Sequence, residues 1–237
     1  REELPADFAA LSYRYPYAEQ TAFPAKLTAT QLKGRAIDEE ISENTTLPPR
    51  LRNLCKPKFL AGKTALTGTE RGTALHAALQ FADLAAAAND LPGEVARLVE
   101  GGWLDAALAG QLELPRMAAF LQSPLAARMR EAKKLLREYD FITAVPAKFV
   151  DDTLPEPFAH QPVLVQGIAD IVLVFDDHIE LLDYKTDRKK TEQEFLDAYR
   201  AQLDLYALAI EKRFAPKPVT YQGIYSFSLN RLLEVET

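Results

Sequence analysis

The chain has 237 residues, of which 48% are hydrophobic and 26% are charged, and its formal net charge is −6 at pH 7. This charged fraction is close to the average of soluble domains, and the length suits one large domain or a domain with an extension. No run approaches the roughly 18 apolar residues that a membrane span needs, so we expect no membrane association. The acidic balance gives no general footprint for nucleic acid, so any DNA contact has to come from local basic patches.

The chain ends and the cysteine content indicate a fragment from a reducing compartment. Cys55 is the single cysteine, which excludes an internal disulfide and any all-cysteine zinc or iron–sulfur site. A cytoplasmic location is the natural expectation. The start, Arg1-Glu2-Glu3-Leu4-Pro5, has neither the apolar core of a signal peptide nor an initiator methionine. We therefore interpret the chain as an excised piece of something longer.

Residues 1–67 are poorly periodic and contain many prolines and charges. We interpret them as an N-terminal arm or linker packed on the main domain, with a disordered linker as the alternative. Thr28–Lys33 could form one short capped helix. Gly62-Lys63-Thr64 imitates the end of a phosphate-binding loop, but Pro57 stands where that loop requires glycine. No ATPase motif is therefore expected in this fragment.

Residues 69–136 have helical periodicity and are rich in alanine, the residue with the highest helix propensity. The first apolar face recurs through Ala74, Leu75, Ala78, Leu79 and Ala82 and continues into the alanine run at 85–88. Breaks at Asn89–Gly93, Gly101-Gly102, Pro115 and Pro124 predict further short helices over about 93–101, 103–110, 113–122 and 124–136.

From residue 137 onward the period changes to two, which predicts a strand that ends at Pro146. Thr191, with Glu194 three residues later, forms a capping box that opens a long helix reaching Phe214. The alternating stretches Val219–Phe227 and Leu232–Val235 predict two closing strands. This order predicts an α/β fold over residues 68–237, with a mixed sheet flanked by helices and a helical insertion.

Two apolar runs, Ile171–Phe175 and Ile179–Leu182, flank a short polar segment and predict a β-hairpin. If the loop is Asp176 and Asp177 alone, counting back along both strands places Asp170 directly opposite Asp183. Like charges at roughly 5 Å in such a pair are destabilising.

Lys185 projects from the same face as Asp183, because side chains two residues apart on a strand share a face. A shared divalent cation would relieve the repulsion between the two acids. The alternative is a solvent-facing edge, or salt bridges to Lys185 and Arg188.

Other candidate residues carry little weight when taken singly. His76 lies on an apolar helix, where a packed or capping histidine is the commoner outcome. Gln202 and Tyr206 are four residues apart and so share one helix face, where a tyrosine usually belongs to the core. The basic run Arg188-Lys189-Lys190 follows the proposed metal site and could hold a phosphate backbone, although such runs are usually solvated.

Four motifs in this order and spacing resemble the RecB-type PD-(D/E)xK nucleases. They are Gly72-Thr73-x-x-His76, Gly167-x-x-Asp170, Asp183-x-Lys185 and Gln202-x-x-x-Tyr206. Within that family the chain is most similar to the C-terminal nuclease domains of AddA-type helicase–nucleases. The similarity extends over nearly the whole chain and includes the stretches Thr67–Thr73, Leu182–Asp187 and Tyr225–Leu229.

The resemblance implies a restriction-endonuclease-like fold and a site for Mg²⁺ or Mn²⁺. It assigns His76, Asp170, Asp183 and the main-chain carbonyl of Tyr184 as metal ligands. It assigns Lys185 to orient the attacking water or to stabilise developing charge. Gln202 and Tyr206 would lie beside the site, and Glu138 would be an outer-shell acid.

The resemblance also implies a metal-dependent DNA exonuclease that processes double-strand DNA ends for recombinational repair. Its substrate would be the 3′-ended single strand of an unwound duplex end. Its partners would be the helicase portion of the same polypeptide and an AddB-like protein. AddB-type nuclease domains hold an iron–sulfur cluster on four cysteines, which one cysteine cannot provide. Two alternatives stay open: an inactive nuclease-like scaffold or DNA-binding domain, and a stand-alone repair or phage nuclease of the same fold.

Overall fold

The computed structural model describes residues 15, 23–28, 68–151, 153–156, 158–186 and 191–235. For residues 68–71 the description covers the backbone only. Of the helix predicted over Thr28–Lys33, only Thr28 lies within the described residues, and there it ends a strand. The division into an arm (1–67) and a nuclease domain (68–237) stays a prediction.

The described residues form a mixed six-stranded sheet, as the sequence predicts. Pairing is antiparallel for β2–β3, β3–β4 and β5–β6 and parallel for β1–β3 and β4–β5. The strands are β1 (Lys26–Thr28), β2 (Lys134–Pro146), β3 (Pro162–Val174), β4 (Ile179–Lys185), β5 (Val219–Ser226) and β6 (Arg231–Val235).

The edges of β3 determine where a site can form. One edge pairs with β2 from end to end. The other edge pairs with β1 at Leu164–Gln166 and with β4 at Ile171–Val174. Between those stretches, within the described chain, residues 167–170 have no strand partner on that edge. The strands β3 and β4 therefore part at a fork, and Asp170 lies at its apex.

The hairpin loop is the predicted pair Asp176 and Asp177. Val174 pairs with Ile179, and the Phe175 N–H donates to the His178 carbonyl at 3.0 Å. Extending this register by one step beyond the last ladder pair brings Asp170 opposite Asp183.

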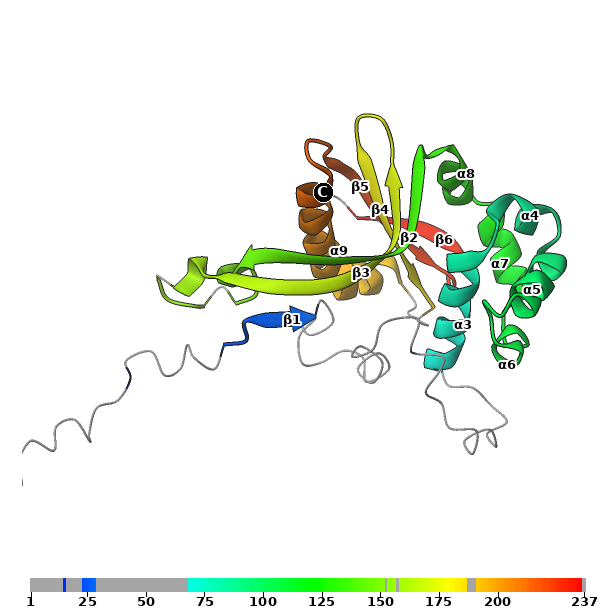
Figure 1. The fold of residues 1–237 in the computed structure, drawn as a ribbon, viewed down its shortest axis with the longest axis horizontal. Coiled ribbons are helices and arrows are strands. Elements are labelled where there is room, and N and C mark those ends of the chain that lie inside the picture. Colours follow the sequence, from blue (N-terminus) through cyan, green and yellow to red (C-terminus); the bar gives the residue numbers. More distant parts are fainter. Residues whose placement is uncertain are drawn as a thin grey trace, which may run out of the picture.

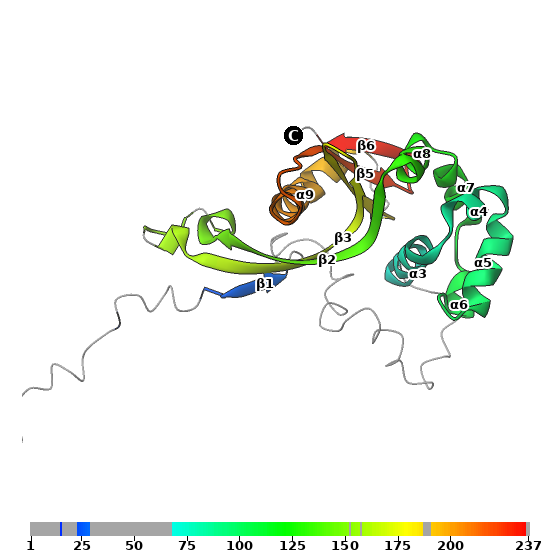
Figure 2. The ribbon, with the colours of Figure 1, turned by 45° about the horizontal axis from the view of Figure 1, so that its top comes forward.

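Both β2 and β3 bend at the level of Asp170, and Figure 2 shows the curve. On β2, Phe141 and Val145 face the same core as Leu136, although alternation would place them on opposite faces. Glu138, between them, has a φ of 49°, a left-handed conformation that non-glycine residues rarely adopt. Glu138 stands opposite Asp170 between two ladder pairs. The change of face therefore happens at the candidate site.

Helices cover both faces of the sheet, with α9 on one side and α3 to α8 on the other (Figure 1). The helices are α3 (Gly68–Phe81), α4 (Leu84–Asn89), α5 (Leu91–Glu100), α6 (Ala106–Ala109), α7 (Leu114–Leu121), α8 (Pro124–Glu131) and α9 (Glu192–Phe214), with short 3₁₀ turns η4 (Ala147–Phe149) and η5 (Phe158–His160). None of the helices in the described ranges is long and apolar enough to cross a membrane.

The long helix α9 begins as the capping pattern predicts, because Thr191 accepts a hydrogen bond from the Glu194 N–H at 3.2 Å. Its buried stripe recurs at three- and four-residue spacing, which turns one face toward the sheet. The largest members of that stripe are Phe195, Tyr199, Leu203, Tyr206 and Ile210.

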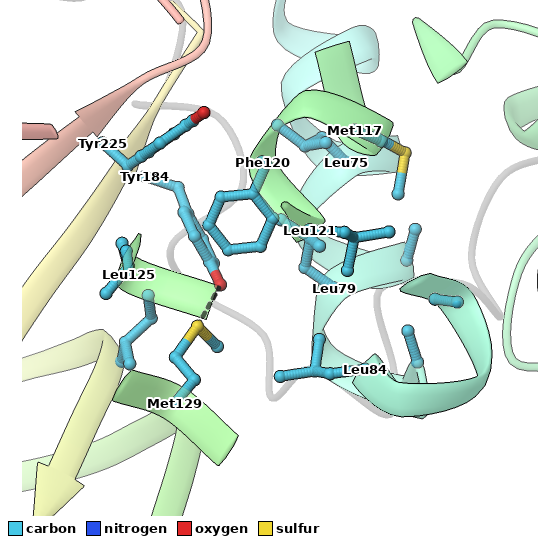
Figure 3. Packing of buried hydrophobic residues seen from close by; sticks show 14 of the residues in the cluster. Leu75, Leu79, Leu84, Met117, Phe120, Leu121, Leu125, Met129, Tyr184 and Tyr225 are labelled. Carbon is cyan, nitrogen blue, oxygen red and sulfur yellow. Dashed lines mark hydrogen bonds between the residues drawn. The ribbon is translucent and has the colours of Figure 1, made fainter. Parts of the chain in front are cut away.

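The helical layer packs on the opposite face of the sheet around Phe120 (Figure 3). The Phe120 ring meets those of Tyr184 and Tyr225 edge to face, with centroids 5.4 and 4.8 Å apart. The Tyr184 hydroxyl lies 3.9 Å from Met129 Sδ. The Tyr184 side chain therefore anchors β4 to the helices, which turns its neighbours Asp183 and Lys185 to the other face.

Two helix boundaries differ from the prediction. The first helix breaks before the alanine run because Asp83 accepts hydrogen bonds from the N–H groups of Ala85 and Ala86 and starts α4. The helix predicted over 124–136 ends at Glu131, and residues 134–136 belong to β2. Lys134, Leu135 and Leu136 pair with Val174, Leu173 and Val172, so tertiary pairing overrides the helical preference of leucine.

Candidate active site

Two buried acids face each other across the fork between β3 and β4. Asp170 is 8% exposed and Asp183 is 2% exposed. The main-chain N–H of Tyr184 donates to Oδ2 of Asp170 at 2.8 Å and so links the two strands where the ladder stops. Asp183 Oδ2 is a buried oxygen that lacks a directed hydrogen bond. This arrangement leaves carboxylate oxygens available to a cation.

Lys185 supplies the positive charge nearest to Asp183. Its Nζ lies 2.6 Å from Asp183 Oδ2, which makes a close ion pair without the alignment of a hydrogen bond. Burial lowers the pKa of Lys185, but the charges of Asp183 and Asp170 outweigh it and raise that pKa overall. Lys185 therefore stays an ammonium at neutral pH.

His76 reaches the acids from α3. Its Nδ1 lies 2.9 Å from Glu138 Oε1 and 3.6 Å from Asp170 Oδ1. Gly72, one turn earlier, permits this approach, because a Cβ there would lie 3.2 Å from Thr186 Oγ1 at the end of β4. The glycine of the Gly72-x-x-x-His76 motif therefore has a packing reason.

Glu138 lies nearer the centre of the site than the outer-shell role expected for it. His76, Glu138 and Asp170 can each offer one ligand atom, and those three atoms lie within 4.8 Å of one another. The positive φ of Glu138 turns its carboxylate toward His76, and such strain is typical of functional sites. Asp183 stands outside this group of three because it faces Lys185.

Gln202 and Tyr206 bind each other on α9, with a hydrogen bond of 2.6 Å from the Gln202 side-chain amide to the Tyr206 hydroxyl. Burial raises the pKa of Tyr206, and the charge of Asp183 adds to that increase. The Tyr206 ring meets Phe141 edge to face at 5.1 Å. Gly167 makes room for both rings, since an added Cβ would lie 2.5 Å from Phe141 Cζ and 3.1 Å from Tyr206 Cε1.

The electrostatics of the site are those of crowded acids. Burial and the neighbouring charge of Asp183 raise the pKa of Asp170 to about 7. Burial lowers the pKa of His76, but Asp170 and Glu138 more than offset it and raise that pKa to about 9. The cluster therefore holds protons that a metal ion would displace.

The donor set fits a divalent cation. Carboxylate oxygens are the ligands that Mg²⁺ and Mn²⁺ prefer, and one imidazole is compatible with Mn²⁺. The buried, repelling acids and the free lone pairs of Asp183 Oδ2 are the observations that support this fit. We conclude that His76, Glu138 and Asp170, with Asp183 beside them, form a candidate metal-binding group.

The predicted DNA-contacting run Arg188-Lys189-Lys190 lies outside the described residues. Sequence reasoning missed Tyr199, whose ring lies under the Lys185 ammonium with Nζ 4.5 Å from the ring centroid. The available signal was its position three residues before Gln202 on the same helix.

A mixed sheet flanked by helices, with acids and a lysine at a strand fork, defines an α/β nuclease of the restriction-endonuclease-like class. The chain belongs to the PD-(D/E)XK nuclease superfamily, whose family model matches residues 50–232.

Curated relatives are named as the AddA-type component of an ATP-dependent helicase/nuclease. The relative from Ruminiclostridium cellulolyticum is 31% identical over 95% of this chain and 18% of its own length. The relatives from Bacillus cytotoxicus and Acetivibrio thermocellus are also 31% identical, over 95% and 98% of this chain and 19% of their own lengths. The chain thus spans about a fifth of the length of these relatives. One solved crystal structure, of SSO0001, aligns with a TM-score of 0.31 and 11% identity over 60% of this chain and 59% of that chain, a similarity too weak to inform the fold.

Proposed function

We propose that the chain is a metal-dependent deoxyribonuclease domain that hydrolyses phosphodiester bonds of single-stranded DNA. The observation that carries the proposal is the fork itself. Asp170 and Asp183 face each other on neighbouring strands, and Lys185 projects from the same face two residues later. Phosphodiester hydrolysis needs a cation to hold the phosphate and a basic group near the attacking water, and this fork offers ligands for the first and a candidate for the second.

The proposed ligands of Mg²⁺ or Mn²⁺ are His76, Asp170, Asp183 and the main-chain carbonyl of Tyr184. Glu138 either joins them or holds His76 through its 2.9 Å contact with Nδ1. A bound divalent cation would supply charge stabilisation of the phosphate and a lowered pKa of water. The burial of the acids supports this assignment, because unpaired buried carboxylates are costly without a cation.

The remaining residues act on the substrate side of the fork. Lys185 would orient the attacking water or neutralise charge that develops on the phosphate. Tyr206 and Gln202, joined at 2.6 Å, would present a polar pair to the lysine, the water or the DNA. Arg188, Lys189 and Lys190 would contact the strand backbone as fixed positive charges.

The relatives named for an ATP-dependent helicase/nuclease support a wider context for this activity. We propose that the domain receives the 3′-ended strand of an unwound duplex end from a helicase motor on the same polypeptide. An AddB-like protein would be its partner, and recombinational repair of double-strand breaks would be the process.

The test is a cleavage assay on single-stranded DNA labelled at its 3′ or its 5′ end, in Mg²⁺, Mn²⁺ or EDTA. Asp183→Ala and Lys185→Ala should each lower the rate by about 100-fold or more. Asp204→Ala, a change of the same residue type at an exposed position of α9, is the matched control. Cleavage that survives both site substitutions, or that persists in EDTA, contradicts the proposed site. A chain that binds the strand but cleaves it in neither metal supports the scaffold alternative.

A further inference from the structure

Lys185 has an unusual second neighbour for a buried ammonium. It is 9% exposed, and its charged contact is Asp183, with 2.6 Å between Nζ and Oδ2. An ammonium has three N–H donors and loses a large hydration free energy on burial. One carboxylate contact leaves the group free to rotate, so something else has to fix its position.

The ring of Tyr199 lies where such a partner is needed. Lys185 Nζ is 4.5 Å from the ring centroid, inside the range of roughly 6 Å over which a cation is attracted to an aromatic face. The attraction is strongest where water is excluded, and Tyr199 is 1% exposed.

The Tyr199 ring is itself held in place. It belongs to the buried stripe of α9 and packs beside Phe195, with ring centroids 6.3 Å apart. Tyrosine also has few rotatable bonds, so little entropy is lost when a packed ring holds a charge. The ring is therefore a rigid platform under a flexible lysine stem.

We infer that Tyr199 is a positioning residue that holds the Lys185 ammonium for phosphodiester cleavage, an inference that rests on the proposed nuclease function. If Asp183 ligates a divalent cation, its negative charge is shared and its hold on Lys185 weakens. The ring of Tyr199 is neutral and does not compete for that cation. It keeps the ammonium in place when the carboxylate is engaged elsewhere.

The first test lowers the negative potential of the ring face while changing its shape little. The reference is Tyr199→Phe, followed by mono-, di- and trifluorophenylalanine at the same position, assayed on single-stranded DNA in Mn²⁺. We expect kcat to fall with each fluorine and to drop about tenfold over the series, with KM unchanged. The same series at Phe195, whose ring has no cation over it among the residues described, should leave kcat unchanged and is the matched control.

The second test does not depend on activity. The ε-methylene protons of Lys185 should have an upfield NMR shift in the wild-type chain, because they lie against a ring face. Tyr199→Leu should return them to the ordinary lysine position.

The outcomes separate the inference from the function on which it rests. An active wild-type chain with a flat fluorine series contradicts the positioning role, and an ordinary Lys185 shift contradicts the contact. A wild-type chain inactive in every metal defeats the proposed function, and the NMR shift then decides the contact by itself.

Discussion

The main-chain N–H of Tyr184 donates a 2.8 Å hydrogen bond to Oδ2 of Asp170, one step beyond the last ladder pair of β3 and β4. A side chain thus replaces the carbonyl that would accept this bond in a continuous sheet. The strands stay joined while they part, and Asp170 is held by one oxygen with the other directed toward His76. The fork is therefore a fixed feature into which a cation would fit.

Gly167→Ala should destabilise the fold and impair the site together. The new Cβ would lie 2.5 Å from Phe141 Cζ, so either that ring or the Tyr206 ring has to move. We expect a loss of about 1–3 kcal/mol in the free energy of unfolding, measured by urea denaturation. Gly110→Ala, where the nearest atoms would be 3.7 Å away, is the control and should be close to neutral. Equal stability of the two variants would show that the close approach at Gly167 has no cost.

Glu138→Gln should weaken Mn²⁺ binding by about 10- to 100-fold, as measured by isothermal titration calorimetry. The amide keeps the size of the side chain but removes a negative charge 2.9 Å from His76 Nδ1. Asp140→Asn, an exposed position two residues along β2, should bind Mn²⁺ as the wild type does. An unchanged affinity of the Glu138 variant would remove Glu138 from the metal site.

The metal-free chain should lose stability as the pH rises from 6 to 9. The pKa of His76 is raised from 6.5 to about 9, so its stabilising contribution is complete below pH 6.5 and is lost as the pH rises through 9. The raised pKa of Asp170, about 7, acts in the same direction from pH 3.8 upward, because the folded state keeps its proton longer than the unfolded chain.

Thermal melts of the metal-free chain across this pH range measure the effect, and His76→Gln should flatten it. Saturating Mn²⁺ should stabilise the wild type more at pH 9 than at pH 6, because the cation competes with the protons on His76 and Asp170. Melting temperatures that rise with pH in the metal-free chain would contradict this assignment of charges.

Gln202→Ala and Tyr206→Phe should act as one unit. Each substitution breaks the 2.6 Å hydrogen bond between the two side chains, so the double variant should cleave DNA no more slowly than the slower single variant. The measurement is a double-mutant cycle on kcat. Additive losses would show that the two residues contribute separately.

The local features of this fold could be predicted because local residues determine them. The loop at Asp176 and Asp177 follows from the apolar runs on either side, and the start of α9 follows from Thr191 and its contact with the Glu194 N–H. The loop length in turn determines the register that brings Asp170 opposite Asp183 at the fork.

The features that escaped prediction depend on segments far apart in the sequence. The parallel pairing of β1 with β3 has no local signal, and the positive φ of Glu138 exists because two strands bend together opposite Asp170. The Tyr199 ring under Lys185 likewise depends on how α9 packs on the sheet. Tertiary packing brings such residues together, and a period in the sequence does not encode it.

The most direct measurement is anomalous diffraction from crystals of the chain soaked in Mn²⁺. The proposed function predicts one strong peak at the fork, roughly 2–2.5 Å from ligand atoms of His76, Asp170 and Asp183. A chain that cleaves DNA only with Mn²⁺, yet shows no peak at the fork or a peak elsewhere, would contradict the proposal that these residues form the metal site.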